Sequence, residues 1–177
     1  MNQSTRRMAA IRLVVAASTG LMLLGASAGW AQQKPLKAQL VGAWTLISVE
    51  VIAKNGTRRP GFGGQNAKGI FILDTSGKYA QVTGRPDRQK LTTTVRKDIP
   101  AAELGEAARA FGGVFGNWSV SETDQTLILK RTLSLIPNSD NTEIRYSVSL
   151  NGDELKLTGR SASTTGARAE LLYRRAK

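Results

Sequence analysis

Residues 40–53 read LVGAWTLISVEVIA, and this stretch decides the fold that the sequence predicts. After Gly42 and Trp44 it consists mostly of β-branched and other apolar residues, the composition of a strand with at least one buried face. Short segments of similar composition follow, separated by turns that contain Gly, Asn or Asp and that typically connect neighbouring strands. The chain is therefore expected to be all-β.

The segments after the first strand are expected to pair as antiparallel neighbours. The turns at residues 74–77 and 122–125 each connect two of them, and Asn151-Gly152 is the strongest hairpin signal in the chain. The expected strands cover residues 40–53, 70–73, 78–83, 114–122, 126–134, 143–150, 155–160 and 167–174. Eight such strands can close into an up-and-down antiparallel barrel that holds one small ligand, and closure leaves no exposed sheet edge. A two-sheet sandwich is the alternative.

One short helix is expected, between the third and fourth strands. Asp98 can cap its first turn, Pro100 suits the start of a helix, and residues 101–110 are rich in helix formers before Gly112-Gly113. Two other segments are expected to be irregular. One is the lead-in at residues 32–39, where Pro35 opposes an early helix, and the other is the Gly-rich loop at residues 60–69, expected at one mouth of the barrel after a short arm at residues 57–60.

Residues 1–31 have the pattern of a signal peptide. A basic start with Arg6, Arg7 and Arg12 precedes an apolar stretch and a run of small residues, with the preferred cleavage after Ala31. An uncleaved anchor is the alternative, but Ser, Thr and Gly interrupt an apolar stretch that is short for a span of ~20 residues. The expected organisation is a signal peptide at 1–31, a lead-in at 32–39 and a barrel domain at 40–177, exported to the periplasm or secreted.

The charge of the chain bears on its partners. The sequence has 25 basic and 13 acidic residues, and cleavage after Ala31 leaves 22 and 13, a net charge of +9. The basic residues are scattered, and this pattern, together with export, argues against nucleic acid as a partner. A solvated basic surface is one interpretation; weak contact with an anionic membrane surface, or an acidic ligand, is the other. We expect a monomer.

The chain contains no histidine and no cysteine. Disulfides, thiol nucleophiles, the usual zinc ligands and the usual general base at neutral pH are therefore excluded. Most acidic residues fall in predicted turns or at strand ends, and no catalytic motif or metal-like carboxylate cluster is present. We expect no cofactor and no metal, and catalysis is not the favoured interpretation.

The first strand also carries a family resemblance. Leu40 to Ser48 has the form Leu-x-Gly-x-Trp-x-Leu-x-Ser, which resembles the bacterial lipocalin-like domain family. The likeness continues at residues 55–58, 69–79, 85–88, 116–122, 151–155 and 170–174. It implies a calycin-type barrel in which Trp44 lies at the closed end beneath an arginine of the last strand. Arg174 is the preferred match for that arginine and Arg175 is the alternative.

A barrel cavity would be lined by the inward side chains of its strands. The candidates for ligand contact are Tyr79, Trp118 and Tyr146, with Arg131 as a possible anchor for a carboxylate or phosphate, and Phe62 and Arg85 on rim loops. Each of them also has an ordinary structural explanation. The resulting hypothesis is an exported protein that binds a small apolar or amphipathic ligand. The alternatives are an enzyme acting on a hydrophobic metabolite in the same cavity, and an envelope interaction protein that uses the barrel as a scaffold.

Overall fold

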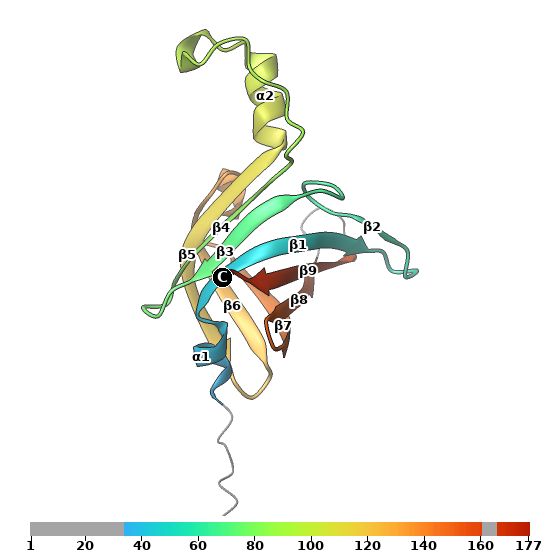
Figure 1. Cartoon of the computed structure of the whole chain (residues 1–177), viewed down its shortest axis with the longest axis vertical. Coiled ribbons are helices and arrows are strands. Elements are labelled where there is room, and N and C mark those ends of the chain that lie inside the picture. Colours follow the sequence, from blue (N-terminus) through green and yellow to red (C-terminus); the bar gives the residue numbers. More distant parts are fainter. Residues whose placement is uncertain (1–33, 161–165) are drawn as a thin grey trace, which may run out of the picture. The chain divides into compact units, whose positions relative to one another are not determined.

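A computed structural model describes residues 34–160 and 166–177 (Figure 1). The expected signal peptide at residues 1–31 lies outside the described residues. Across the described part of the chain, neither helix has the length and apolar character needed to cross a bilayer.

The described residues form one antiparallel sheet that closes on itself (Figure 1). Its strands are β1 (Gly42–Ile52), β2 (Arg58–Pro60), β3 (Lys68–Leu73), β4 (Lys78–Gly84), β5 (Phe111–Ser121), β6 (Thr126–Ser134), β7 (Glu143–Asn151), β8 (Glu154–Arg160) and β9 (Arg168–Arg175). Neighbours in the chain pair with one another from β3 to β9, and β9 returns to pair with β1. All of them except β2 make up a closed eight-stranded barrel, which confirms the predicted fold and excludes the sandwich.

Strand β1 connects the parts of the sheet because it has three partners. It pairs with β9 from Trp44 to Ile52, with β3 over residues 42–45 and with β2 over residues 50–52. Strands β2 and β3 therefore follow one another along the same edge of β1, and the Gly-rich loop between them lies at the end of the barrel where β1 finishes. The short arm expected before Pro60 is β2.

The core lies inside the barrel and follows the two-residue period of the strands. Leu127 and Leu129 of β6, Leu155 and Leu157 of β8, and Tyr173 of β9 are buried, whereas the residues between them point outward. Apolar side chains fill the half of the barrel near Trp44.

A helical turn, α1 (Leu36–Leu40), covers the closed end, where the sequence had indicated an irregular lead-in. The helix starts directly after Pro35, a residue that is tolerated at a helix start because it has no N–H to satisfy there. The Glu122 carboxylate, from the turn after β5, accepts hydrogen bonds from the backbone N–H groups of Leu36 (2.8 Å) and Lys37 (2.9 Å). Pro35 provides no side-chain cap for the helix, so Glu122, 85 positions further along the chain than Lys37, supplies it. The local sequence does not reveal this contact.

Trp44 closes the barrel beneath α1. Its side chain is fully buried, and its indole N–H donates to the carbonyl oxygen of Leu40 at 2.8 Å. The guanidinium of Arg175 lies 4.1 Å from the ring centroid and donates to the carbonyl oxygens of Val41 (3.1 Å) and Gln39 (2.7 Å).

The preferred prediction, that Arg174 stacks on Trp44, is therefore wrong, and the alternative, Arg175, is the partner of Trp44. Trp44 stands opposite Arg175 in the β1–β9 register, and Arg175 shares the inward face of β9 with Leu171 and Tyr173. Arg174 points to solvent. Because strand side chains alternate, the burial of Tyr173 places the arginine two positions further on inside the barrel.

The expected helix is α2 (Ala101–Arg109), which stands beyond the start of β5 (Figure 1). Its ends differ from the prediction. Asp98 belongs to a preceding 3₁₀ turn, η1 (Arg96–Asp98), and Pro100 occupies the cap position with no side-chain cap. Gly112 and Gly113 do not end the helix but belong to β5, because their backbones pair with Thr83 and Val82 of β4. None of the α2 side chains is buried.

We expect Arg175→Ala to lower the free energy of unfolding by about 2 to 4 kcal/mol, because it removes a cation–π contact and leaves two carbonyl oxygens without donors. Urea titration measures this change. Arg174→Ala is the matched control and should change stability by less than about 0.5 kcal/mol, since its side chain is exposed. Equal effects of the two substitutions would contradict the assignment.

Candidate ligand cavity at the barrel mouth

A cavity of about 320 Å³ lies at the end of the barrel opposite Trp44. Inward side chains of the barrel form its walls, and the last turn of α2, the Gly-rich loop and the β6–β7 connection form its rim. The lining residues are Val49, Phe62, Gln81, Thr83, Ala108, Arg109, Gly112, Gly113, Val114, Arg131, Ser134, Leu135, Ile136, Ser139 and Leu171. Small-molecule sites typically have a volume of about 300–1,000 Å³ and a mostly apolar lining with a few polar groups. The mouth cavity meets this description at its lower size limit.

Arg131 is the charged residue that the barrel wall contributes to the lining of the mouth cavity, and it also borders an open hollow of about 840 Å³ beside Thr142, Glu143 and Arg145. It is half-buried, and its Nη1 donates to the hydroxyl of Thr142 at 3.2 Å. Within the described residues no carboxylate forms an ion pair with it. A guanidinium held this way has donors left for a planar anion such as a carboxylate.

Gly116 lets the backbone of β6 approach β5 closely beside Arg131. In the sheet register, Tyr79 of β4, Gly116 of β5 and Arg131 of β6 lie in one row, next to an irregularity in the β5–β6 ladder. A Cβ atom at Gly116 would lie 2.1 Å from the carbonyl oxygen of Lys130, so no other residue fits this backbone. The side chains of Tyr79 and Arg131 therefore flank a position without a side chain, and the arginine charge acts on the phenol.

Three buried tyrosines lie beneath or beside the mouth cavity. Burial raises the pKa of Tyr79 to about 12, and the nearby positive charge of Arg131 opposes this shift. Burial also raises the pKa of Tyr146, again opposed by Arg131, and the pKa of Tyr173. All three phenols therefore stay protonated at neutral pH and are poor bases there.

The hydroxyls of Tyr79 and Tyr173 differ in their partners. Gln81, which lines the mouth cavity, donates from Nε2 to the hydroxyl oxygen of Tyr173 at 2.7 Å. The Tyr79 hydroxyl is buried and has no hydrogen-bond partner among the described residues. A buried polar group without a partner costs free energy, so Tyr79 is a donor that the fold itself does not use.

The structure separates the six candidate ligand contacts. Phe62 and Arg131 line the mouth cavity, and Tyr79 and Tyr146 belong to the buried core beside Arg131. Trp118 lies at the closed end, where its indole donates to the carbonyl oxygen of Asp74 at 2.9 Å. It is buried and is not among the residues that line the mouth cavity.

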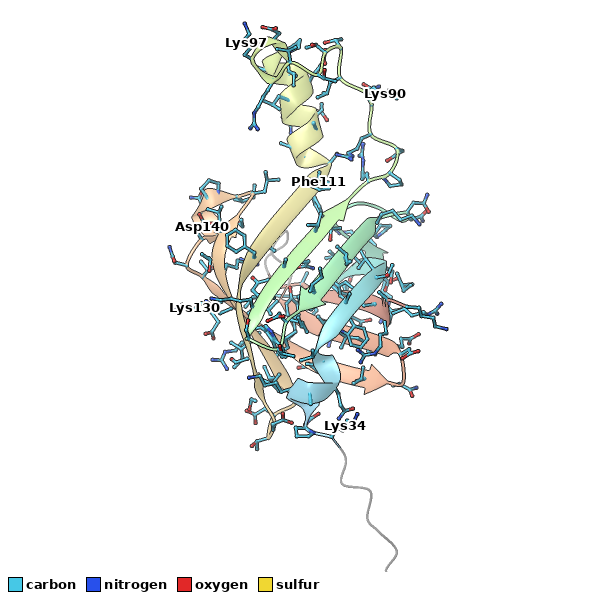
Figure 2. The ribbon with its side chains drawn as sticks, turned by 60° about the vertical axis from the view of Figure 1, so that its left-hand side comes forward. Lys34, Lys90, Lys97, Phe111, Lys130 and Asp140 are labelled. Carbon is cyan, nitrogen blue, oxygen red and sulfur yellow. The ribbon has the colours of Figure 1, made fainter. Side chains whose placement is uncertain are left out.

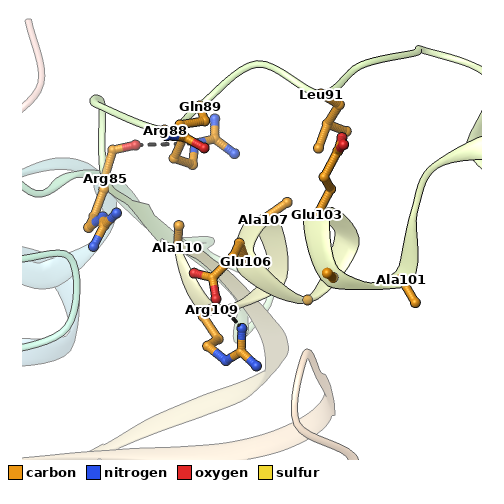
Figure 3. Close-up of a pocket in the computed structure, with 12 residues that line it drawn as sticks. Arg85, Arg88, Gln89, Leu91, Ala101, Glu103, Glu106, Ala107, Arg109 and Ala110 are labelled. Carbon is orange, nitrogen blue, oxygen red and sulfur yellow. Dashed lines mark hydrogen bonds and ion pairs between the residues drawn. The ribbon is translucent and has the colours of Figure 1, made fainter.

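Arg85 lies outside the barrel, in a groove of about 360 Å³ between residues 85–91 and α2 (Figure 3). The charged groups here have partners within the groove or its loop: Arg85 with Asp87 (3.5 Å) and Arg109 with Glu106 (2.5 Å). The Glu103 carboxylate accepts hydrogen bonds from the backbone N–H (2.9 Å) and the hydroxyl (3.1 Å) of Thr92. The contact between Thr92 and Glu103 holds the loop against α2, so we interpret the groove as structural.

Several residues of the mouth cavity were not among the sequence candidates. Gln81 and Thr83 alternate with Tyr79 on β4, so the two-residue period could have identified them. Leu135, Ile136 and Arg109 could not have been found in this way, because they come from segments whose position depends on how α2 and the β6–β7 connection fold over the rim. Among the described residues no three acidic side chains gather into a metal-binding group.

A closed eight-stranded antiparallel barrel whose strands pair in chain order defines the class of up-and-down β-barrels. The model of the lipocalin-like domain family matches residues 41–176, and the chain belongs to this family. No curated protein matches the sequence.

Solved structures align over most of the chain at low identity. A lipocalin-like protein from Bacteroides uniformis is 14% identical, with a TM-score of 0.41, and covers 77% of this chain and 98% of its own. An uncharacterized protein from Bacteroides eggerthii is 11% identical, with a TM-score of 0.41 and the same coverage. A mutant of the fluorescent protein UnaG is 15% identical, with a TM-score of 0.36, and covers 78% of this chain and 96% of its own. Membership of the family rests on the match over residues 41–176.

We expect tyrosine ionisation to begin above the ordinary pKa of 10, because all three tyrosines of the chain are buried. The fold favours the neutral phenols, so their contribution to stability is complete below pH 10 and is lost as pH rises toward and through about 12. Near-ultraviolet absorbance of tyrosinate, followed together with circular dichroism, measures both effects. Any tyrosine that ionises near pH 10 in the folded protein would contradict the expected burial.

Two matched substitutions test the unpaired hydroxyl. Tyr79→Phe removes a buried donor that has no partner, so the protein without ligand should keep its stability or gain up to about 1 kcal/mol. Tyr173→Phe removes the acceptor of Gln81 and should cost about 1 kcal/mol. Urea titrations measure the free energy of unfolding of both variants. An equal loss of stability in both would show that the Tyr79 hydroxyl has a hydrogen-bond partner.

Proposed function

We propose that this protein binds a small, largely apolar molecule with an anionic group in the mouth cavity. The observation that carries the proposal is Arg131, a half-buried guanidinium without a carboxylate partner in the described structure, in the wall of a mostly apolar cavity. Membership of the lipocalin-like family supports a barrel that holds a small hydrophobic ligand.

The mouth cavity suggests how such a molecule would be oriented. Val49, Val114 and Leu171 offer apolar wall surface, and Phe62 offers an aromatic face at the rim. Arg131 would bind the anionic group, since a planar guanidinium matches a carboxylate with two parallel hydrogen bonds. Removing a lone positive charge from water is costly, and a bound anion would relieve that cost. The anionic end would therefore enter first, with the apolar part toward the rim.

The contacts favour binding over catalysis at this site. The tyrosines near the mouth cavity have raised pKa values and remain protonated, so they are poor general bases at neutral pH. None of the Asp or Glu side chains in the described part of the chain is buried, so no buried carboxylate is available there as an acid or base. A buried carboxylate or a readily deprotonated tyrosine in the cavity would instead have supported the alternative, an enzyme acting on a hydrophobic metabolite.

We also propose that the protein acts after export, in the periplasm or outside the cell. The basic, apolar and small-residue pattern of residues 1–31 supports this proposal. Mass spectrometry of the protein purified from cell fractions tests it, and an uncleaved chain in the cytoplasm would overturn it.

Two related probes test the role of Arg131. Anilinonaphthalene sulfonate carries an anionic group, and N-phenylnaphthylamine has a similar aromatic body without one. Arg131→Gln should weaken binding of the sulfonate probe by about ten-fold or more, because it removes a charge-assisted contact. The same substitution should leave binding of the neutral probe within about two-fold. Fluorescence titration measures both affinities.

Arg145→Gln is the control, because Arg145 is also on the β6–β7 side of the barrel but points outward and pairs with Glu143 at 2.8 Å. It should leave both probes unaffected. If Arg131→Gln weakens binding of both probes equally, the mouth cavity binds apolar molecules but the assignment of Arg131 as the anchor of an anionic group is wrong. If neither probe binds the unmodified protein, and solvent extraction followed by mass spectrometry finds no bound molecule, the proposed function is wrong.

A further inference from the structure

Five exposed apolar side chains lie on segments at the end of the barrel that carries the mouth cavity. Val95 (48% exposed), Leu104 (41%) and Ile136 (59%) stand on three separate segments there: the loop before α2, α2 itself and the β6–β7 connection. Phe62 and Leu135 on the rim are also exposed. Apolar side chains that project separately from one end of a molecule can insert into a docking surface without forming one contiguous patch.

Basic side chains accompany these apolar residues. Residues 85–97 contain five basic residues and one acidic residue, and all six side chains are exposed. Asp98 pairs with Lys97 at 3.9 Å, and with α2 included, residues 85–110 have six basic and four acidic residues, a net charge of +2. Figure 2 shows Lys90 and Lys97 at the α2 end of the barrel, and Lys34 at the opposite end. The guanidinium of Arg88 lies 5.0 Å from the ring centroid of the exposed Phe111, so charge and apolar surface are in direct contact.

We propose that this mouth face, made of Val95, Leu104, Ile136 and the basic loop 85–97, docks on an anionic lipid bilayer. Apolar side chains on loop tips and a helix can enter the boundary between headgroups and acyl chains, while the basic residues beside them contact anionic headgroups. This combination of an exposed apolar surface and a local excess of positive charge matches the chemistry of such a membrane surface.

Two other occupants fit the mouth face less well. A second copy of the chain, docked face to face, would bring two basic loops together, and like charges at short distance repel. A protein partner of defined shape is typically received by a well-packed apolar centre. Here the exposed apolar residues stand on separate projecting segments, and α2 buries none of its side chains.

Docking in this orientation would place the mouth cavity toward the lipid. Phe62, Leu135 and Ile136 belong both to the cavity rim and to the apolar surface at this end of the barrel. An apolar ligand could then pass between bilayer and cavity with little exposure to water. The docking itself depends only on the surface residues, so its test is independent of whether a ligand binds in the cavity.

The test measures co-sedimentation of the protein with vesicles. The full sequence is expressed, and the protein is purified as the cell has processed it. Vesicles of phosphatidylglycerol and phosphatidylcholine are compared with vesicles of phosphatidylcholine alone. We expect binding to the anionic vesicles at low salt, at least about ten-fold weaker binding to the neutral ones, and a clear loss when salt is raised to about 0.5 M. No binding to anionic vesicles would overturn the proposal.

The basic contribution is tested with Lys90→Gln, Arg96→Gln and Lys97→Gln combined. This variant should bind anionic vesicles at least about ten-fold more weakly, since each basic residue near an anionic surface strengthens binding several-fold. The matched control combines Lys34→Gln, Lys156→Gln and Lys177→Gln, three exposed lysines outside the basic loop. The control should bind like the unmodified protein. An equal loss in both variants would overturn the assignment to the mouth face.

The apolar contribution is tested in the same way. Val95→Ser, Leu104→Ser and Ile136→Ser together should weaken vesicle binding by about ten-fold or more. Ile47→Ser, Ile70→Ser and Ile72→Ser form the control, because these side chains have similar exposure (42%, 40% and 41%) but lie on the outer face of β1 and β3. Urea midpoints verify that all variants are folded. Unchanged binding of the first variant, or concentration-dependent dimerisation through the same residues without vesicle binding, would overturn the proposal.

Discussion

The sealing of one barrel end around Trp44 is the constraint on which the rest of the structure depends. A tube of eight strands open at both ends would admit water along its whole length, and its apolar side chains would gain little by facing inward. Trp44 is fully buried, with Arg175 stacked on its ring and α1 covering it. This seal needs contributions from the first strand, the last strand and, through Glu122, the turn after β5. The barrel can therefore have a filled end and an open end.

Polar side chains stand where the buried core meets the mouth cavity. Tyr79 and Tyr173 belong to the core, and Gln81, which donates to the Tyr173 hydroxyl, lines the cavity. The Tyr79 hydroxyl has no partner among the described residues. The neighbouring Tyr146 packs against a glycine, because a Cβ atom at Gly159 would be 2.6 Å from its ring. These groups give this part of the barrel a hydrogen-bonding capacity that a purely apolar core would lack.

The irregular lead-in and the end of α2 were predicted wrongly for the same physical reason. The lead-in helix α1 depends on Glu122, and the end of α2 depends on the pairing of Gly112 and Gly113 with β4. Both are decided by partners distant in the chain, which outweigh the weak local preferences of Pro35, Asp98 and glycine. The choice of Arg174 over Arg175 is different in kind. Strand alternation alone could have corrected it once Tyr173 was assigned to the inside.

The sequence by itself determined the all-β class and the positions of the eight strands, because these follow from a two-residue apolar period and from turn residues that act over a few positions. The strand count favoured a closed barrel over a sandwich, and the place of Trp44 at its closed end was implied by the family resemblance. It also singled out Arg131 as a charge on an apolar face. Only the tertiary structure decided that the core fills one half of the barrel, that Tyr79 has an unused hydroxyl, and that α2 and the loop before it project from the mouth. Those features depend on how side chains from distant strands share a limited volume, and no local pattern encodes that outcome.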